Sequence, residues 1–255
     1  MATAVALNLF VLAFIGGLIT YGLVLAAGVE IWRTGTRGKF QGVTAALIIV
    51  AVFAGPFSYL SAYFELPRLN DISTDINTPP RFVAIARERS PRANPVTFDA
   101  RRAANFQRAA YPDLRSITVP RSGANAFELV VDTLQRLHFK IISRQQPNLR
   151  TGRPGWVEAQ DRTLIMGFYD DVVVRIIGDL RRSRIDIRSA SRYGQHDFGQ
   201  NATRIRRILN ELQLRLEATV TTTLRDRLGK RRREIRARIR ARRRELKRKK
   251  LKRRQ

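Results

Sequence analysis

The sequence predicts an α+β fold, with an antiparallel sheet of four to five strands and helices on one face. Two transmembrane helices precede it and a basic helical tail follows. Three observations predict this: long uncharged runs open the chain, short apolar runs occupy its middle, and Lys and Arg dominate its end. We expect four parts: a transmembrane hairpin (1–66), a Pro-rich wrapping segment of the soluble domain (67–121), an α+β core (122–222) and a basic amphipathic tail (223–255).

Composition excludes some chemistry and locates most of the charge. The chain has no Cys, which excludes disulfides, thiolate catalysis and Cys-based zinc sites. Its net charge is +27, and residues 225–255 contribute +16 of it, from 19 Lys and Arg against three acids. Only in this tail does charge alone indicate an anionic partner.

The first two elements are the uncharged runs, Ala4–Val29 with 26 residues and Val43–Tyr63 with 21. A helix needs about 20 apolar residues to cross a bilayer, so we expect an integral, multi-pass protein of the inner membrane. A signal peptide is the alternative for the first run. That run is longer than the apolar part of a signal peptide, and no Lys or Arg precedes it.

The loop between the runs sets the expected orientation. It contains Arg33, Arg37 and Lys39, whereas the N-terminus has no basic side chain. Basic short loops stay in the cytoplasm. The soluble part is therefore expected outside, in the periplasm of a Gram-negative cell.

The Pro-rich segment 67–121 shows little periodicity. Its apolar residues, such as Phe82, Phe98 and Tyr111, favour a segment that wraps the core over a disordered linker. Residues 100–110 are expected to form a short helix.

The core begins with a helix at 122–139, capped by Ser122 or Asn125. Strands are expected at 140–144, at 155–169 as one strand or a hairpin, and at 172–177. A further strand alternates Ile with Arg and Asp from 184 to 188, which is typical of a half-buried strand. Apolar residues from 198 to 216, in steps of three and four, predict a final helix.

Five blocks in this region carry a family resemblance: Asn70–Asp75, Ala110–Leu114, Glu158–Thr163, Gly167–Ile176 and Asp186–Ile205. They resemble the family catalogued as domain of unknown function 1499, over roughly residues 70–216. The resemblance implies a soluble domain that is often attached to membrane helices in bacteria. It implies no reaction.

The loop from Ser189 to Asn201 is the candidate site, because it joins a strand end to a helix N-terminus, where free N–H groups favour an anion. The predicted anion-binding residues are Arg188, Ser189, Ser191, Arg192, His196, Asp197, Asn201 and Arg204. A structural role is the alternative. In it, Asp197 and Gln200 form a capping box and Asn201 ties the loop to the sheet through Arg188.

Two sharper chemical hypotheses remain open. Ser189 or Ser191 with His196 and Asp197 supplies the residue types of a hydrolase triad, but a His rarely meets an acid adjacent in sequence. Asp170 and Asp171 could hold a hard cation or act as acid and base, although a turn between strands fits them better. We therefore assign no catalytic residue, no metal ligand and no cofactor.

The tail predicts an amphipathic helix, because five aliphatic residues from Leu224 to Leu246 fall on one narrow stripe. Such a helix is suited to anionic lipid headgroups or an anionic envelope polymer. A solvated charge run is one alternative and a nucleic-acid-binding arm another. We expect a membrane-anchored, non-catalytic binding or accessory domain of the cell envelope. The alternatives are a ribosome- or nucleic-acid-associated membrane protein with a cytoplasmic domain, and a hydrolase.

Overall fold

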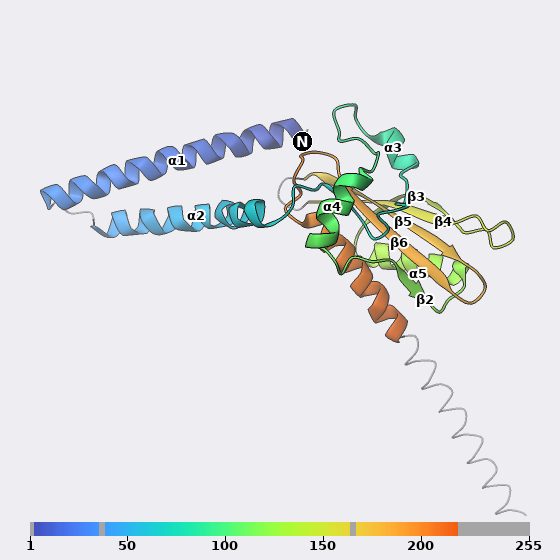
Figure 1. Ribbon diagram of the computed structural model, residues 1–255. Coiled ribbons are helices and arrows are strands. Elements are labelled where there is room, and N and C mark those ends of the chain that lie inside the picture. Colours follow the sequence, from blue (N-terminus) through green and yellow to red (C-terminus); the bar gives the residue numbers. More distant parts are fainter. Residues whose placement is uncertain (1–2, 36–38, 164–166, 219–255) are drawn as a thin grey trace, which may run out of the picture. The chain divides into compact units, whose positions relative to one another are not determined.

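The computed structural model describes residues 3–35, 39–163 and 167–218. It begins with two helices that are apolar on every side, α1 (Thr3–Thr34) and α2 (Lys39–Glu65), which lie next to each other (Figure 1). The rings of Phe14 and Phe53 meet edge to face at 5.7 Å. Gly17 permits this approach, since a Cβ atom there would lie 3.0 Å from the Phe53 ring.

Of these two helices, α1 alone provides a stretch long enough to cross a bilayer within the described residues. Val11–Thr34 has a mean hydropathy of 2.1, and none of its most apolar stretch is buried. In α2 the apolar stretch is the shorter segment Gly42–Ala54. One candidate membrane helix is therefore shown, and the second span stays a prediction.

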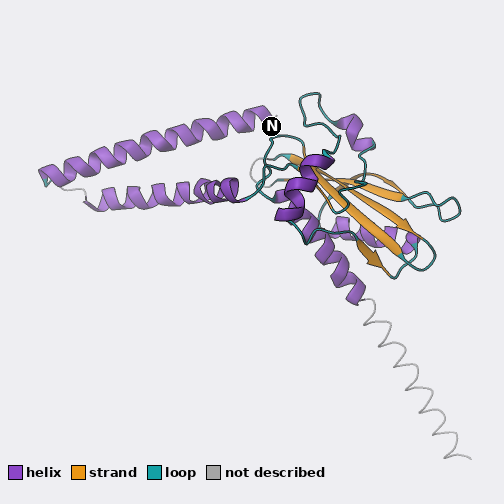
Figure 2. Ribbon diagram, in the orientation of Figure 1, coloured by secondary structure: helices purple, strands orange, loops and turns teal. Residues whose placement is uncertain are grey.

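The predicted α+β class with an antiparallel sheet is confirmed, but the sheet has six strands (Figure 2). Its strand order is β1 (Asp71–Ser73), β6 (Ser183–Ser191), β5 (Tyr169–Gly178), β4 (Gly155–Arg162) and β3 (Lys140–Gln145). A sixth strand, β2 (Ile117–Val119), also pairs with β6. The prediction missed β1 and β2, because three residues are too few to show an alternating pattern.

One face of the sheet is the apolar core. Along β5 and β6 it presents Val172, Val174, Ile176, Ile185 and Ile187, all 0% exposed. Helix α5 (Gly123–Arg136) contacts β3, β4, β5 and β6, and its Phe127, Val130 and Leu134 are buried. Ser122 caps α5 by accepting from the backbone N–H of Asn125, as predicted.

The opposite face is also covered, so the prediction of helices on one face is wrong. Helix α3 (Ala84–Glu88) and the segment just before it pack Ile85 and Phe82 against Val173 of β5 and Ala190 of β6. The buried carboxylate of Glu158 in β4 accepts from the backbone N–H groups of residues 83, 84 and 85. As a consequence β6, expected to be half-buried, is buried on both faces from Ile185 to Ser191.

Two further helices complete the described residues. In α4 (Ala100–Ala110), the buried side chain of Gln107 bonds both the N–H and the carbonyl of Ser73, which attaches the helix to β1. A C-terminal helix spans residues 200–218, and its Ala202, Ile205 and Ile208 are buried. The predicted basic tail, residues 223–255, lies outside the described residues.

Candidate functional site

The eight predicted anion-binding residues divide between the two faces of the sheet. Successive side chains of a strand point to opposite faces, so Ser189 and Ser191 of β6 lie on the face of the apolar core and Arg188 on the other. Arg192, which follows β6, binds Asp171 of β5 on the same side as Arg188. The loop therefore does not bring the eight together as one site.

A first polar cluster closes around Arg204 of the C-terminal helix. Its guanidinium donates to Asp161 (2.8 Å), to Asp170 (2.7 Å), and to the side-chain oxygens of Ser189 (3.1 Å) and Asn201 (2.9 Å). Asn201 in turn accepts from the hydroxyl of Ser189 and donates to that of Ser191. All three nitrogens of Arg204 are thus used in attaching the helix to β4, β5 and β6.

The second cluster lies on the other face and contains Arg188. This side chain is 2% exposed and forms a two-bond ion pair with Asp71 of β1, at 2.9 and 2.6 Å. It also donates to the carbonyls of Pro80 and Val96 in the segment that covers the face. Nearby, Asp171 accepts from Arg89 and Arg192.

These clusters correct the expectation for Asp170 and Asp171. Both belong to β5 rather than to a turn, and as neighbours in a strand they face opposite sides of the sheet. Each is buried against arginine, Asp170 with Arg204 and Asp171 with Arg89 and Arg192. Within the described residues no cluster of acids and histidines suits a metal ion.

Asp197 has the predicted capping role, by a different set of bonds. Its carboxylate accepts from the backbone N–H groups of Gly199 (2.9 Å) and Asn201 (2.8 Å) at the start of the C-terminal helix. Burial raises the pKa of Asp197, and these two N–H groups oppose the rise. The backbone N–H of Asp197 donates to Leu69 instead of completing a capping box with Gln200. Asn201 ties the loop to the sheet through Ser189 and Ser191 and not through Arg188.

His196 lies in an aromatic stack beside the end of α2. Its ring is 4.7 Å from that of Phe198 and 5.3 Å from that of Tyr63, and its Nδ1 accepts from the backbone N–H of Phe198. The two candidate serines bond Asn201 instead. No hydrogen bond between the described side chains joins either serine to His196, so this geometry gives the triad hypothesis no support.

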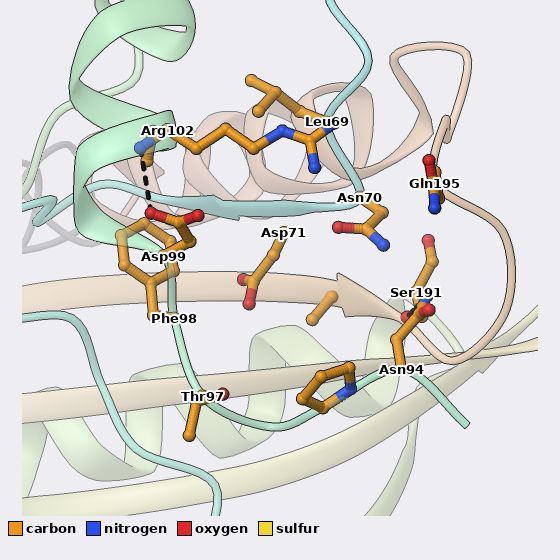
Figure 3. Close-up of a pocket in the computed structure, with 13 residues that line it drawn as sticks. Leu69, Asn70, Asp71, Asn94, Thr97, Phe98, Asp99, Arg102, Ser191 and Gln195 are labelled. Atoms are coloured by element: carbon orange, nitrogen blue, oxygen red, sulfur yellow. Dashed lines mark hydrogen bonds between the residues drawn. The ribbon is translucent and has the colours of Figure 1, made fainter. Parts of the chain in front are cut away.

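A cavity of about 240 Å³ lies where β1, the end of β6, the N-terminus of α4 and the segment 94–98 meet (Figure 3). Its polar lining includes Asn70, Asp71, Asn94 and Asp99, and Phe98 contributes an aromatic wall. The side-chain N–H₂ groups of Asn70 and Asn94 donate to the carbonyl of Gly194. Their amide oxygens are left to accept, so the cavity is suited to a ligand that donates hydrogen bonds.

Asp71 connects this cavity with the buried ion pair. Burial raises the pKa of its carboxyl group, and the guanidinium of Arg188 opposes the rise. A carboxyl group with a shifted pKa in a cavity is typical of a functional site. Of the eight predicted site residues, Ser191 lies in the lining of this cavity. The block Asn70–Asp75 of the family resemblance contributes Asn70 and Asp71, which were not predicted as site residues. Asn94 and Phe98 gave no such signal.

Comparison with known proteins agrees with the resemblance seen in the sequence. The profile of one family, described as Protein of unknown function (DUF1499), matches residues 71–212. No curated protein matches the chain.

Proposed function

This chain belongs to the DUF1499 family, whose description assigns no activity, and we propose that it acts as a membrane-anchored binding domain without catalysis. The proposal combines three parts: an anchor in the lipid, a folded domain with a ligand cavity, and a basic tail. Each has its own support.

The observation that carries the proposal is the apolar surface of α1. On one side of the helix, Leu12, Ile19 and Leu23 are each more than 60% exposed. On other sides, Val11, Ile15 and Leu18 are 46%, 48% and 50% exposed. Val11–Thr34 has 24 residues, a length of about 36 Å at 1.5 Å per residue. Because the hydrocarbon core of a bilayer is about 30 Å thick, lipid can cover this surface along its whole length.

We further propose that α2 is a second crossing. Its Leu47, Val50 and Phe57 are strongly exposed, which again favours lipid over water. With two crossings, the basic loop around Arg33, Arg37 and Lys39 is cytoplasmic and the folded domain lies on the other side, periplasmic in a Gram-negative inner membrane.

The role of the folded domain is binding. The serines, arginines and Asp197 of the candidate loop stabilise the fold through buried bonds, which favours a structural role for them. The cavity of Figure 3 is the proposed ligand site, for a small molecule rich in hydroxyl or amino groups. The basic tail binds anionic lipid headgroups or an anionic envelope polymer, because its charge per residue far exceeds that of the rest of the chain.

Topology and extraction test this proposal together. The full chain is expected to stay in the membrane pellet after alkaline carbonate washing, and alkaline phosphatase fused after Tyr63 is expected to be active. A fusion after Gly35, in the loop, is the matched control and should be inactive. A protein released by carbonate would contradict the anchor, and the reverse pattern of fusion activity would place the domain in the cytoplasm.

A further inference from the structure

A second hollow, distinct from the cavity of Figure 3, lies between the end of α4, the turn at 111–116 and the start of β6. Its volume is about 520 Å³. Three arginines from three segments line it: Arg108 of α4, Arg115 of the turn and Arg184 of β6. We call it the basic groove.

The charge of the basic groove is not balanced from within. Asp75 is the acidic side chain in its lining. Its carboxylate forms ion pairs with Arg184 (2.6 Å) and Arg175 (3.0 Å) and accepts a hydrogen bond from the hydroxyl of Thr78 (2.6 Å). Arg108 donates to the amide oxygen of Asn77 and Arg115 to the carbonyl of Pro112. Among the described residues, neither of these two arginines pairs with a carboxylate.

The pKa of Asp75 is consistent with a net positive charge in the groove. Burial raises the pKa of Asp75, but the bonds from Thr78 and the charges of Arg184 and Arg175 outweigh it, so the pKa is lowered overall. Asp75 is therefore ionised at neutral pH and neutralised by its partners. The positive charge of Arg108 and Arg115 is left for an anion from outside.

The side chains that line the groove are held in place before any ligand arrives. Buried Gln107 attaches α4 to β1 next to Arg108. Buried Tyr111 and Leu114 fix the turn that presents Arg115. Arg184 donates to Asp186 and to the hydroxyl of Ser116, which leaves the hydrogen of that hydroxyl for a further acceptor. Pre-ordered donors lose less conformational entropy on binding.

We propose that the basic groove binds the phosphate group of a small phosphate ester. Guanidinium groups form paired, charge-assisted hydrogen bonds with phosphate oxygens, and several of them around one group are typical of phosphate recognition. The groove is in the size range of pockets for organic ligands and is larger than a bare ion requires. The ester is either a free metabolite or a lipid headgroup, and both present the same chemistry. This site depends neither on the tail nor on the membrane topology.

The test is binding of glycerol 3-phosphate and of inorganic phosphate to the full chain in a neutral detergent, measured by calorimetry. In the variant Arg108→Gln/Arg115→Gln, affinity for glycerol 3-phosphate is expected to fall about tenfold or more, since two charge-assisted contacts are lost. The matched control is Arg136→Gln/Arg144→Gln, which removes two exposed charges elsewhere and should change affinity less than about twofold. The tail is the same in all three proteins, so its own anion binding cancels.

Equal losses in the two double variants, or no loss in either, would overturn the proposal. Arg108 and Arg115 each donate one hydrogen bond to a neutral oxygen, so the thermal unfolding of the double variant is expected to be unchanged. This measurement separates loss of binding from loss of fold.

Nanodiscs of phosphatidylcholine with or without phosphatidylglycerol distinguish a free phosphate ester from a lipid headgroup as the ligand. Displacement of glycerol 3-phosphate by phosphatidylglycerol that depends on Arg108 and Arg115 supports a headgroup, and retained binding supports a free ester.

Discussion

The arginines of the buried sheet and those of the basic groove differ in what they contact. On the sheet, Arg188 and Arg204 are almost fully buried, and each meets carboxylates at 2.6 to 2.9 Å. In the groove, Arg108 and Arg115 are exposed and meet neutral oxygens. A buried charge is too costly to leave unpaired, whereas water tolerates an unpaired charge at the surface. Unmatched charge therefore carries information about ligands only where solvent reaches it.

The buried arginines are balanced by acids from distant parts of the chain. The arginines Arg89, Arg188, Arg192 and Arg204 pair with Asp71, Asp161, Asp170 and Asp171, four charges of each sign. Each pair joins two elements, such as the C-terminal helix to β5 or β6 to β1. The pairs thus connect the segments that cover the sheet, and their loss should affect stability more than any change in the groove.

The largest expected effect is at Arg204. Lysine keeps the charge but cannot reach four acceptors in four directions, so Arg204→Lys leaves either buried Asp170 or half-buried Asp161 without a partner. We expect the free energy of unfolding to fall by about 3–5 kcal/mol, measured by urea denaturation of the full chain in detergent. The control Arg207→Lys, on the same helix but exposed, should change it by less than about 0.5 kcal/mol. Equal stability of the two variants would show that Arg204 is not structural.

The next effect concerns the pair of Arg188 and Asp71. Replacing both, as Arg188→Met/Asp71→Leu, removes the charges together and leaves the carbonyls of Pro80 and Val96 without their donor. We expect a loss of about 1–3 kcal/mol for those carbonyls, smaller than the loss from Arg188→Met alone. A double variant less stable than Arg188→Met would contradict the idea that the unpaired carboxylate of Asp71 is the main cost of losing Arg188.

A smaller loss is expected at Asp197. Asp197→Ala removes the cap of the C-terminal helix and should cost about 0.5–2 kcal/mol, whereas Asp197→Asn keeps an acceptor and should cost less. Because burial raises its pKa above the unfolded value of 3.8, the folded state holds this proton more tightly. Wild-type stability should therefore increase relative to Asp197→Asn as the pH falls towards 3.8 and then level off. The opposite slope would mean that the N–H groups outweigh burial.

Sequence patterns predicted the elements that contact their neighbours along the chain. The helix expected at 122–139 is α5, and the strands expected at 140–144 and 184–188 lie within β3 and β6. The three-residue strands β1 and β2 could not be predicted, because they are defined only by pairing with β6 more than sixty residues away. Local periodicity carries no information about such pairing.

The candidate site was harder to predict for the same reason. The alternation of Ile with Arg and Asp in β6 indicated a solvent-facing side, yet Asp186 and Arg188 are buried. Each has a partner in another element, Asp186 with Arg175 of β5 and Arg188 with Asp71 of β1. A loop rich in Arg, Ser and Asn resembles an anion site until those distant acids are located. The basic groove gave no local signal either, since its three arginines lie in separate segments.

The smallest expected effect is at the exposed pair of Arg206 and Asp113, whose side chains are 41% and 49% exposed. Arg206→Gln should cost less than about 1 kcal/mol, because solvent screens the pair. Its hydrogen bonds lower the pKa of Asp113 below the unfolded value of 3.8, against a weaker effect of burial. The contribution is therefore complete above pH 3.8 and is lost as the pH falls through the lowered pKa. The difference between wild type and Arg206→Gln should vanish in strong acid and shrink in concentrated salt. A difference that persists in both would mean that the contact of the Arg206 guanidinium with the Tyr111 ring, and not its charge pair, is what stabilises this surface.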